Sequence, residues 1–549
     1  MQGVLSRMVK NIEHQRTHSR VTATKVAGHF RIVSVATSIS RVTGFFRDQL
    51  NSWIFGAGLV SDSYFAALRI PNLLRDLFAE GALSSAFIPT LSKSLEKEKV
   101  EETWKLISQV FTLLLLIVGL VVAAGIFAAP WIVRMVAPGF LGDPAKFELT
   151  VNLTRILFPV LLFVSMAALW MGTLNSHDKF LAPAFAPVAM NITLILAGLY
   201  LFYWPSMRDN ADEIQKIHIW TAATTVGFFL QWLVQVPAAR GLGGRFKLIW
   251  PPTHPGIAEM LFLLAPAVIS LSVTQVDFLL NQIFASFLKT GSITCLNYGN
   301  RLMQLPYGVF GVSIATVVLP LMSRQMADGD EKGFGDTLTH AIGAAAFIMI
   351  PSTVGLCIIS LPICRLAFQH GHFTEESTLM VADATCFYVA GLFAHAGIKI
   401  TAQAFYPLRK PKWPFWAAVI NMISTALLNL AALVFLTDPY QKFLALPLAT
   451  TVGVFFTFFF LFYGLSRYGV KFEFKFIFKE IFKIILASFG MGLAAWWTLR
   501  LLIQQDVPFG KVLDVFIPII VGAAVYFILA KLIRCESFEW IITRRKKKA

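Results

Sequence analysis

The sequence predicts an all-α membrane protein that crosses the bilayer about fourteen times, and three observations lead to this class. Of the 549 residues, 56% are hydrophobic and 14% charged, whereas soluble domains carry about 25% charged residues. Apolar runs such as residues 110–129 can cross a hydrocarbon core of roughly 30 Å, which takes about 20 residues. These runs lack the alternation of barrel strands, so helices are the structure that satisfies their backbone in lipid.

The apolar segments and the breakers between them define the predicted spans. They cover residues 31–55, 62–92, 103–129, 148–174, 181–205, 216–238, 257–288, 292–325, 336–362, 377–406, 413–436, 441–466, 475–502 and 508–533. The first, second and eighth are the least apolar. Residues 1–30 are polar and basic and do not resemble a cleaved signal peptide, so we expect the first span to remain in the mature protein.

Positive charge is concentrated in alternate connections. The basic stretches are the N-terminal tail, the loops after spans two, six, ten and twelve, and the terminal "RRKKKA". The connection at residues 56–62 contains no Lys or Arg. By the positive-inside rule, both termini are predicted to be cytoplasmic. The net charge of +16 is therefore interpreted as a topology signal and a contact with anionic membrane lipids, with no nucleic-acid partner.

A weak internal repeat divides the chain. "FIPTLSKSL" (87–95) resembles "VLPLMSRQM" (318–326), which favours two six-helix lobes related by a pseudo-two-fold axis along the membrane normal. This arrangement is typical of transporters with a substrate site between the lobes. The predicted domains are a basic cytoplasmic tail, an N-lobe, a C-lobe, a C-terminal pair of helices and a second basic tail, at residues 1–30, 31–240, 257–468, 475–534 and 535–549.

Charged residues interrupt the first, second and eighth predicted spans. Such groups cost several kcal/mol in a bilayer and usually face a cavity or a partner. The arginines outnumber the carboxylates, and guanidinium groups suit phosphate oxygens, so we predict a site for an anionic, phosphate-bearing ligand. The arginines are Arg41, Arg47, Arg69, Arg75 and Arg301. The alternative is a set of buried ion pairs that lock helix packing, a role that suits Asp48, Asp76 and Glu80 equally well.

Pro and Gly interrupt the helices that carry these charges, at residues 69–89 and 301–311, which would allow the bending that alternating access requires. Four further ionisable groups are candidates for coupling to Na⁺ or H⁺, although each one alone is better explained as a packing group. They are Asp277, Asp383, His395 and Lys399. The five cysteines show no ligand spacing, so no metal site, cofactor or disulfide framework is predicted.

The stretch "SRVTGFFRDQLNSWIFGAGLVSDSYFAALRIPNLLRDLFAEGALSSAFIPTLSK" (40–93) resembles the N-terminal signature of the MurJ (MviN) lipid II flippases. "NRLMQLPYGVFGVSIATVVLPLMSRQ" (300–325) resembles the eighth helix of the same family, which belongs to the multidrug/oligosaccharidyl-lipid/polysaccharide exporter superfamily. The resemblance implies two lobes around a cationic central cavity and a groove for the lipid tail in the last two helices. It also implies a bacterial inner-membrane protein that moves lipid II, an undecaprenyl diphosphate bearing a disaccharide-pentapeptide, toward the periplasm.

The resemblance assigns the cavity arginines to Arg41, Arg47, Arg75 and Arg301, and Arg69 occupies a position that is basic in relatives. Asp62 and Glu80 match acidic positions, for which a structural or gating role is implied. The family's eighth helix often carries two carboxylates where this chain has Asn300 and Gln304, which leaves Arg301 without those neighbours. A seventh-helix Asp binds sodium in some relatives, and Asp277 lies in the predicted seventh span.

Three other classes are weighed against this function. An O-antigen-type flippase or a multidrug/cation antiporter would share the fold, but cation antiporters should prefer cavity carboxylates to arginines. A membrane enzyme acting on prenyl diphosphates would need acidic metal ligands or a nucleophile with its base, and the sequence has no such cluster. A scaffold would not need the arginine set. We therefore predict a transporter, monomeric and associated with the cell-wall synthesis machinery, driven by Na⁺, H⁺ or the membrane potential.

Overall fold

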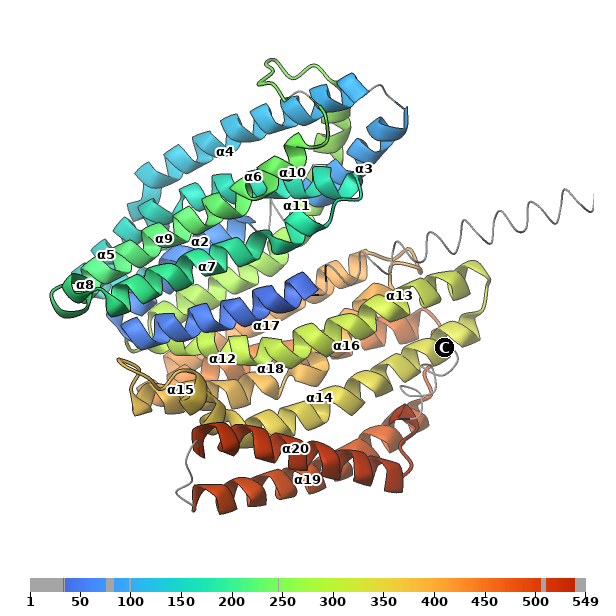
Figure 1. Cartoon of the computed structure of the whole chain (residues 1–549). Coiled ribbons are helices and arrows are strands. Elements are labelled where there is room, and N and C mark those ends of the chain that lie inside the picture. The colour runs from blue at the N-terminus through green and yellow to red at the C-terminus, as the bar shows by residue number, and fades with distance from the viewer. Residues whose placement is uncertain are drawn as a thin grey trace, which may run out of the picture. The chain divides into compact units, whose positions relative to one another are not determined.

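A computed structural model describes residues 33, 35–75, 83–97, 100–244, 246–504 and 510–538 (Figure 1). Helix covers most of the described residues in each of the fourteen predicted segments. Within these ranges nine helices are long and apolar enough to cross a membrane, and the bent pair α15 (Glu375–Val389) and α16 (Leu392–Ala404) makes a tenth. The all-helical, multi-span class is thus confirmed, and the count of fourteen crossings stays a prediction.

The chain forms two compact units. The first is built from the described residues of Met1–Asn51, Ile70–Ala129 and Asn152–Leu271, and the second from those of Ser52–Arg69, Pro130–Val151 and Ser272–Ala549. Residues 35–55, here called the first helix, contribute to both units. So do four later helices: α2 (Leu59–Leu74), α4 (Val100–Val136), α5 (Pro144–Leu157) and α11 (Pro255–Ser286).

Helices of the first unit pack through small residues and aromatic rings. They are α3 (Leu83–Lys97), α4 (Val100–Val136, of which Val100–Ala129 lies in this unit), α6 (Pro159–Ser176), α7 (Leu181–Tyr203), α8 (Pro205–Asp209), α9 (Glu213–Leu233) and α10 (Gln235–Arg240). A Cβ atom at Gly125 would lie 2.0 Å from the ring of Phe158, so only glycine lets α4 approach so closely. Figure 1 shows α7 and α9 side by side, and these two helices contact each other.

An extended segment after α10 is fastened to α4 in the same unit. Gln109 Oε1 accepts hydrogen bonds from the backbone N–H groups of Thr253 and His254, at 3.2 and 2.9 Å. Two α4 hydroxyls, those of Ser108 and Thr112, accept further backbone N–H groups from this segment. Polar side chains in the otherwise apolar α4 therefore satisfy a backbone that has no helical partners of its own.

The second unit contains most of the long helices. They are α2 (Leu59–Leu74, of which Leu59–Arg69 lies in this unit), η2 (Pro138–Gly142), α12 (Ser292–Pro306), η3 (Tyr307–Gly311), α13 (Val312–Ala327), α14 (Glu331–Ala367), α15, α16, α17 (Lys412–Phe435), α18 (Pro439–Arg467), α19 (Phe474–Ile503) and α20 (Gly510–Leu532). The predicted interruption at residues 301–311 is a π-helical turn, η3. The other predicted break covers residues 69–89. Its prolines, Pro71 and Pro89, lie inside α2 and α3 (Leu83–Lys97), and residues 76–82 lie outside the described residues.

The C-terminal hairpin of α19 and α20 packs against α14, as Figure 1 shows. Phe347 of α14, Ile484 of α19 and Tyr526 of α20 belong to one buried cluster, and the Tyr526 hydroxyl donates to the Phe347 carbonyl at 2.7 Å. The fully buried carboxylate of Glu480 accepts from Lys483 Nζ at 2.9 Å and from the backbone N–H of Ser537 at 3.1 Å. This contact fixes the start of the C-terminal tail on α19.

Candidate functional site

Arg47 donates hydrogen bonds to several side chains inside the first unit, among them Met190 Sδ at 3.6 Å. Its Nε and Nη2 atoms donate to Asp48 Oδ1 at 3.0 and 2.7 Å, and Nη1 donates to Asn191 Oδ1 at 3.0 Å. The Arg47 and Asp48 side chains are 16% and 13% exposed. The guanidinium therefore stays charged inside a helical bundle because a carboxylate and an amide replace part of its hydration.

Asn191 was not predicted from the sequence as a site residue. It lies in α7, is 3% exposed, and its Nδ2 atom donates to the Ser40 carbonyl at 3.0 Å and to Thr43 Oγ1 at 3.1 Å. The signal that could have identified it is an amide in the middle of an apolar run, since a buried amide needs partners.

The other predicted arginines occupy different surroundings. Arg41 is exposed and Arg75, directly after α2, is half-buried. Arg69 lies in the second unit with its guanidinium carbon 4.6 Å from the centroid of the Phe278 ring. Arg301 is exposed on α12, one residue after Asn300, which accepts a hydrogen bond from Gln304 Nε2 at 2.6 Å. Asp76 and Glu80 lie outside the described residues.

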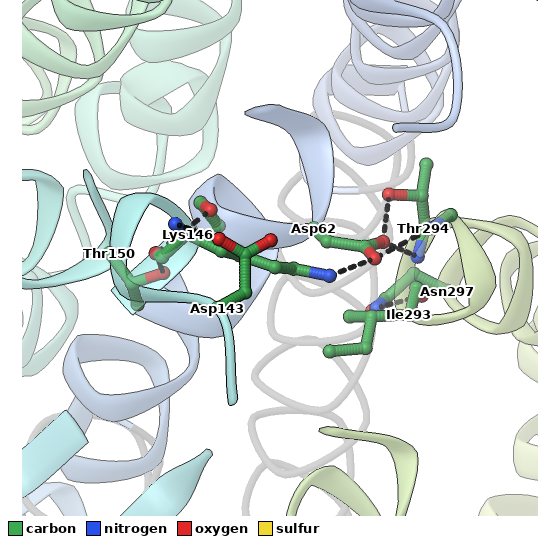
Figure 2. A network of polar contacts seen from close by, with 9 residues as sticks. Asp62, Asp143, Lys146, Thr150, Ile293, Thr294 and Asn297 are labelled. Carbon is green, nitrogen blue, oxygen red and sulfur yellow. Dashed lines mark hydrogen bonds and ion pairs between the residues drawn. The ribbon is translucent and has the colours of Figure 1, made fainter. Parts of the chain in front are cut away.

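Asp62 is the centre of a buried polar network in the second unit (Figure 2). Its Oδ2 atom accepts from Lys146 Nζ at 2.9 Å and from the Gly291 N–H at 2.7 Å. Its Oδ1 atom accepts from the N–H and the hydroxyl of Thr294, at 2.9 and 2.8 Å. The side chains of Lys146 and Asp62 are 5% and 1% exposed. Four donors occupy the lone pairs of a carboxylate that is almost completely removed from solvent.

This network joins three elements that are distant in sequence. Asp62 belongs to α2, Lys146 to α5, and Gly291 and Thr294 to the N-terminal end of α12. The first N–H groups of a helix have no intrahelical acceptors and carry a partial positive charge, so a carboxylate stabilises them. Gly291 has φ +93°, and a Cβ there would lie 2.8 Å from the carbonyl oxygen of Ala57. Asp62 was predicted from the sequence as a site residue, whereas Lys146 was not.

A second polar cluster of the same unit surrounds Asp277. Asn421 Nδ2 donates to Asp277 Oδ2 at 3.3 Å, and Asn281 Nδ2 donates to the Asp277 carbonyl at 3.1 Å. Asn429 Nδ2 in turn donates to Asn281 Oδ1 at 2.9 Å. Within the described residues, three buried oxygens of this region have no hydrogen-bond partner: Asp277 Oδ1, Thr425 Oγ1 and Asn429 Oδ1. Unsatisfied buried oxygens are costly and suit a cation or a proton.

The remaining coupling candidates have less distinctive surroundings. Asp383 accepts a hydrogen bond from the Tyr440 hydroxyl. The His395 ring lies 5.7 Å, centroid to centroid, from the Tyr307 ring, and Lys399 is exposed. Among the described residues, no hydrogen bond joins Asp277, Asp383 and His395 to one another.

Enclosed charges and amides within apolar spanning helices are typical of membrane transporters, because such groups often lie along the path of ions or polar substrates. A family model described as "Lipid II flippase MurJ" matches residues 52–516. The "Probable lipid II flippase MurJ" of Vibrio cholerae serotype O1 is 33% identical over 450 residues, which cover 80% of this chain and 82% of the relative. The "Lipid II flippase MurJ" of Burkholderia cenocepacia is 33% identical over 442 residues, covering 80% and 83%.

Solved structures agree with these matches. A structure titled "Lipid II flippase MurJ, inward closed conformation" aligns with a TM-score of 0.74 and 28% identity, covering 91% of this chain and 98% of that one. An inward-facing multidrug resistance MATE family transporter of the MOP superfamily aligns with a TM-score of 0.63 at 12% identity, which shows a shared fold alone. The chain belongs to the lipid II flippase MurJ family, and it is a transporter rather than an enzyme.

Proposed function

We propose that this flippase carries lipid II from the cytoplasmic to the periplasmic leaflet by alternating access, with arginines of a central cavity binding the diphosphate headgroup. The residues proposed for headgroup binding are Arg41, Arg47, Arg69, Arg75 and Arg301. The observation that carries the proposal is the Arg47 guanidinium, which is 16% exposed and held by Asp48 and Asn191. A guanidinium maintained at such a site supplies donors that match phosphate oxygens.

The headgroup charge would drive the conformational cycle. Binding of the diphosphate neutralises the arginines and lets them approach one another, after which the cavity opens outward. An inside-negative membrane potential opposes outward displacement of unneutralised arginines by about 2.3 kcal/mol per charge per 100 mV. The empty, cationic protein therefore resets toward the cytoplasm, while the polyprenyl tail stays in lipid or in a groove of α19 and α20.

We also propose that Asp62 is a gating residue. Its carboxylate accepts hydrogen bonds from Lys146 of α5 and from the N-terminal end of α12. When these elements separate, the carboxylate loses hydrogen bonds from one side at a cost of about 1–3 kcal/mol for each unmade buried contact. The strength of this network therefore determines what fraction of the protein keeps α2, α5 and α12 together.

Asp277 is the group that we propose for coupling to Na⁺ or H⁺, ahead of Asp383, His395 and Lys399. Its unpartnered Oδ1 atom, together with the buried oxygens of Thr425 and Asn429, supports this choice. Oxygen donors of this kind suit a hard monovalent cation, and a proton would equally neutralise the carboxylate. When bound, the ion would remove one negative charge near Arg69, which interacts electrostatically with Asp277.

For the topology, we propose fourteen crossings in the bacterial cytoplasmic membrane, with both termini in the cytoplasm. The basic connections support this orientation, because Lys and Arg are retained on the cytoplasmic side. We further propose a monomer with the predicted lobe boundaries, which works alongside the cell-wall synthesis machinery.

The test is the leaflet accessibility of lipid II headgroups in cells depleted of this protein and complemented with variants. Arg41→Ala, Arg47→Ala, Arg75→Ala and Arg301→Ala should each fail to restore export at normal expression. Arg240→Ala, which removes an exposed arginine at the end of α10, serves as the matched control and should export normally. Restoration of export by all four cavity variants would refute the arginine proposal.

A further inference from the structure

We propose that Asn191 is a positioning residue that orients Arg47 toward the anionic headgroup without neutralising it. The inference rests on the proposed headgroup role of Arg47 and adds a residue from a different helix. Asn191 lies 144 positions along the chain from Arg47 and bonds to it at 3.0 Å. Its own side chain is 3% exposed.

The hydrogen bonds determine which way the amide of Asn191 points. Its Nδ2 atom has two acceptors in the first helix, the Ser40 carbonyl at 3.0 Å and Thr43 Oγ1 at 3.1 Å. A flipped amide would place N–H groups against the guanidinium N–H groups, and the two acceptors would face an oxygen. The amide oxygen is therefore committed to Arg47 Nη1.

The contact spans two turns of the first helix. Ser40, Thr43 and Arg47 are three and four positions apart, which places them on one helix face. Asn191 of α7 therefore forms hydrogen bonds both to the Ser40 backbone and to the Arg47 side chain. Without this contact the long side chain keeps its hydrogen bonds to Asp48 but gains torsional freedom, so the direction of the guanidinium is less well defined.

The neutrality of this partner matters for an anionic ligand. Asp48 already supplies a carboxylate to Nε and Nη2 of Arg47. A second carboxylate at position 191 would give the group a net negative charge and would repel a diphosphate. An amide also accepts from Nη1 but adds no charge, so it orients the guanidinium while the group formed with Asp48 stays neutral overall and does not repel an anion.

A double-mutant cycle on the full-length protein in nanodiscs tests the inference, with the apparent Kd for lipid II as the readout. Asn191→Ala should weaken binding about tenfold, the usual effect of one lost hydrogen bond to a charged group. In the Arg47→Ala background, the same substitution should change the Kd by less than about twofold, since a positioning residue acts only through its target. Thr193→Val, which removes a hydroxyl bonded within α7, is the matched control and should bind normally.

Asn191→Asp gives a second, near-isosteric variant that keeps an acceptor for Arg47. It should bind lipid II more weakly than Asn191→Ala, because it adds the second carboxylate. Equal losses from Asn191→Ala with and without Arg47 would show a merely structural role and overturn the inference, as would wild-type affinity of either Asn191 variant. If the Arg47→Ala variant bound lipid II normally, the proposed headgroup role of Arg47 would be wrong, and so would the inference that rests on it.

Discussion

Lys146 Nζ lies 2.9 Å from Asp62 Oδ2, and both side chains are at least 95% removed from solvent, with exposures of 5% and 1%. An ammonium and a carboxylate so enclosed depend on each other, because either charge alone would have to be desolvated without compensation. The pair connects α5 with α2, and the same carboxylate binds the N-terminal end of α12.

Substitution of Lys146 by Met should therefore destabilise the protein strongly. We expect a loss of about 3–5 kcal/mol, since the carboxylate of Asp62 stays buried without its counter-charge. Thermal unfolding of the detergent-solubilised protein measures the effect. The matched control is Lys289→Met, which breaks an exposed pair with Glu376 of similar length, 2.8 Å, and should cost less than about 1 kcal/mol. Equal effects of the two substitutions would contradict the role assigned to burial.

A substitution of Gly291 should disturb the same network through the backbone. Gly291→Ala places a side chain at φ +93° and a Cβ atom 2.8 Å from the Ala57 carbonyl oxygen. The left-handed conformation alone costs an alanine about 1–2 kcal/mol, and the close contact adds to it. We expect a lower midpoint of thermal unfolding, whereas Gly58→Ala, which has open space around its Cβ position, should be nearly neutral. A neutral Gly291→Ala variant would show that this turn relaxes freely.

Asp277→Asn should separate the coupling step from headgroup binding. The substitution removes the charge that a cation or proton would neutralise, so flipping in proteoliposomes should lose its response to an imposed Na⁺ or pH gradient. Lipid II affinity should change less than about twofold. Asp383→Asn, which alters a carboxylate already bonded by Tyr440, is the comparison and should retain the response. Loss of the response in Asp383→Asn alone would transfer the coupling role to that residue.

Cys535, just beyond α20, should react slowly with thiol reagents. Burial, assisted by the negative charge of Glu480, raises the pKa of the Cys535 thiol to about 11 from an ordinary value of 9.0, although Lys483 opposes the shift. A pKa that is two units higher makes the thiolate fraction about 100-fold lower near neutral pH. Maleimide labelling of a variant with Cys535 as its sole cysteine should therefore accelerate as pH rises toward 11. A sole cysteine introduced by Ser466→Cys, at an exposed position, should label rapidly near neutral pH.

The sequence by itself determined the class of this protein and the positions of its helices. Apolar runs of spanning length, such as residues 110–129, indicate burial in lipid, and helix covers most of the described residues of each predicted segment. Intramembrane charges were equally visible, because Arg47 and Asp48 stand out against an apolar background, whereas Asp62 was identified from the family resemblance. Periodicity and composition are local properties, and they suffice for features that depend on local burial.

Only the tertiary structure decided the partners of those charges. Asp62 binds Lys146, which is 84 positions away, and Arg47 binds Asn191, which is 144 positions away. The local sequence around Lys146 or Asn191 does not indicate which residue it contacts. A lysine near a helix start or an asparagine in an apolar run fits many environments. The pairing follows from which helix faces meet, and that is settled by the packing of many side chains together.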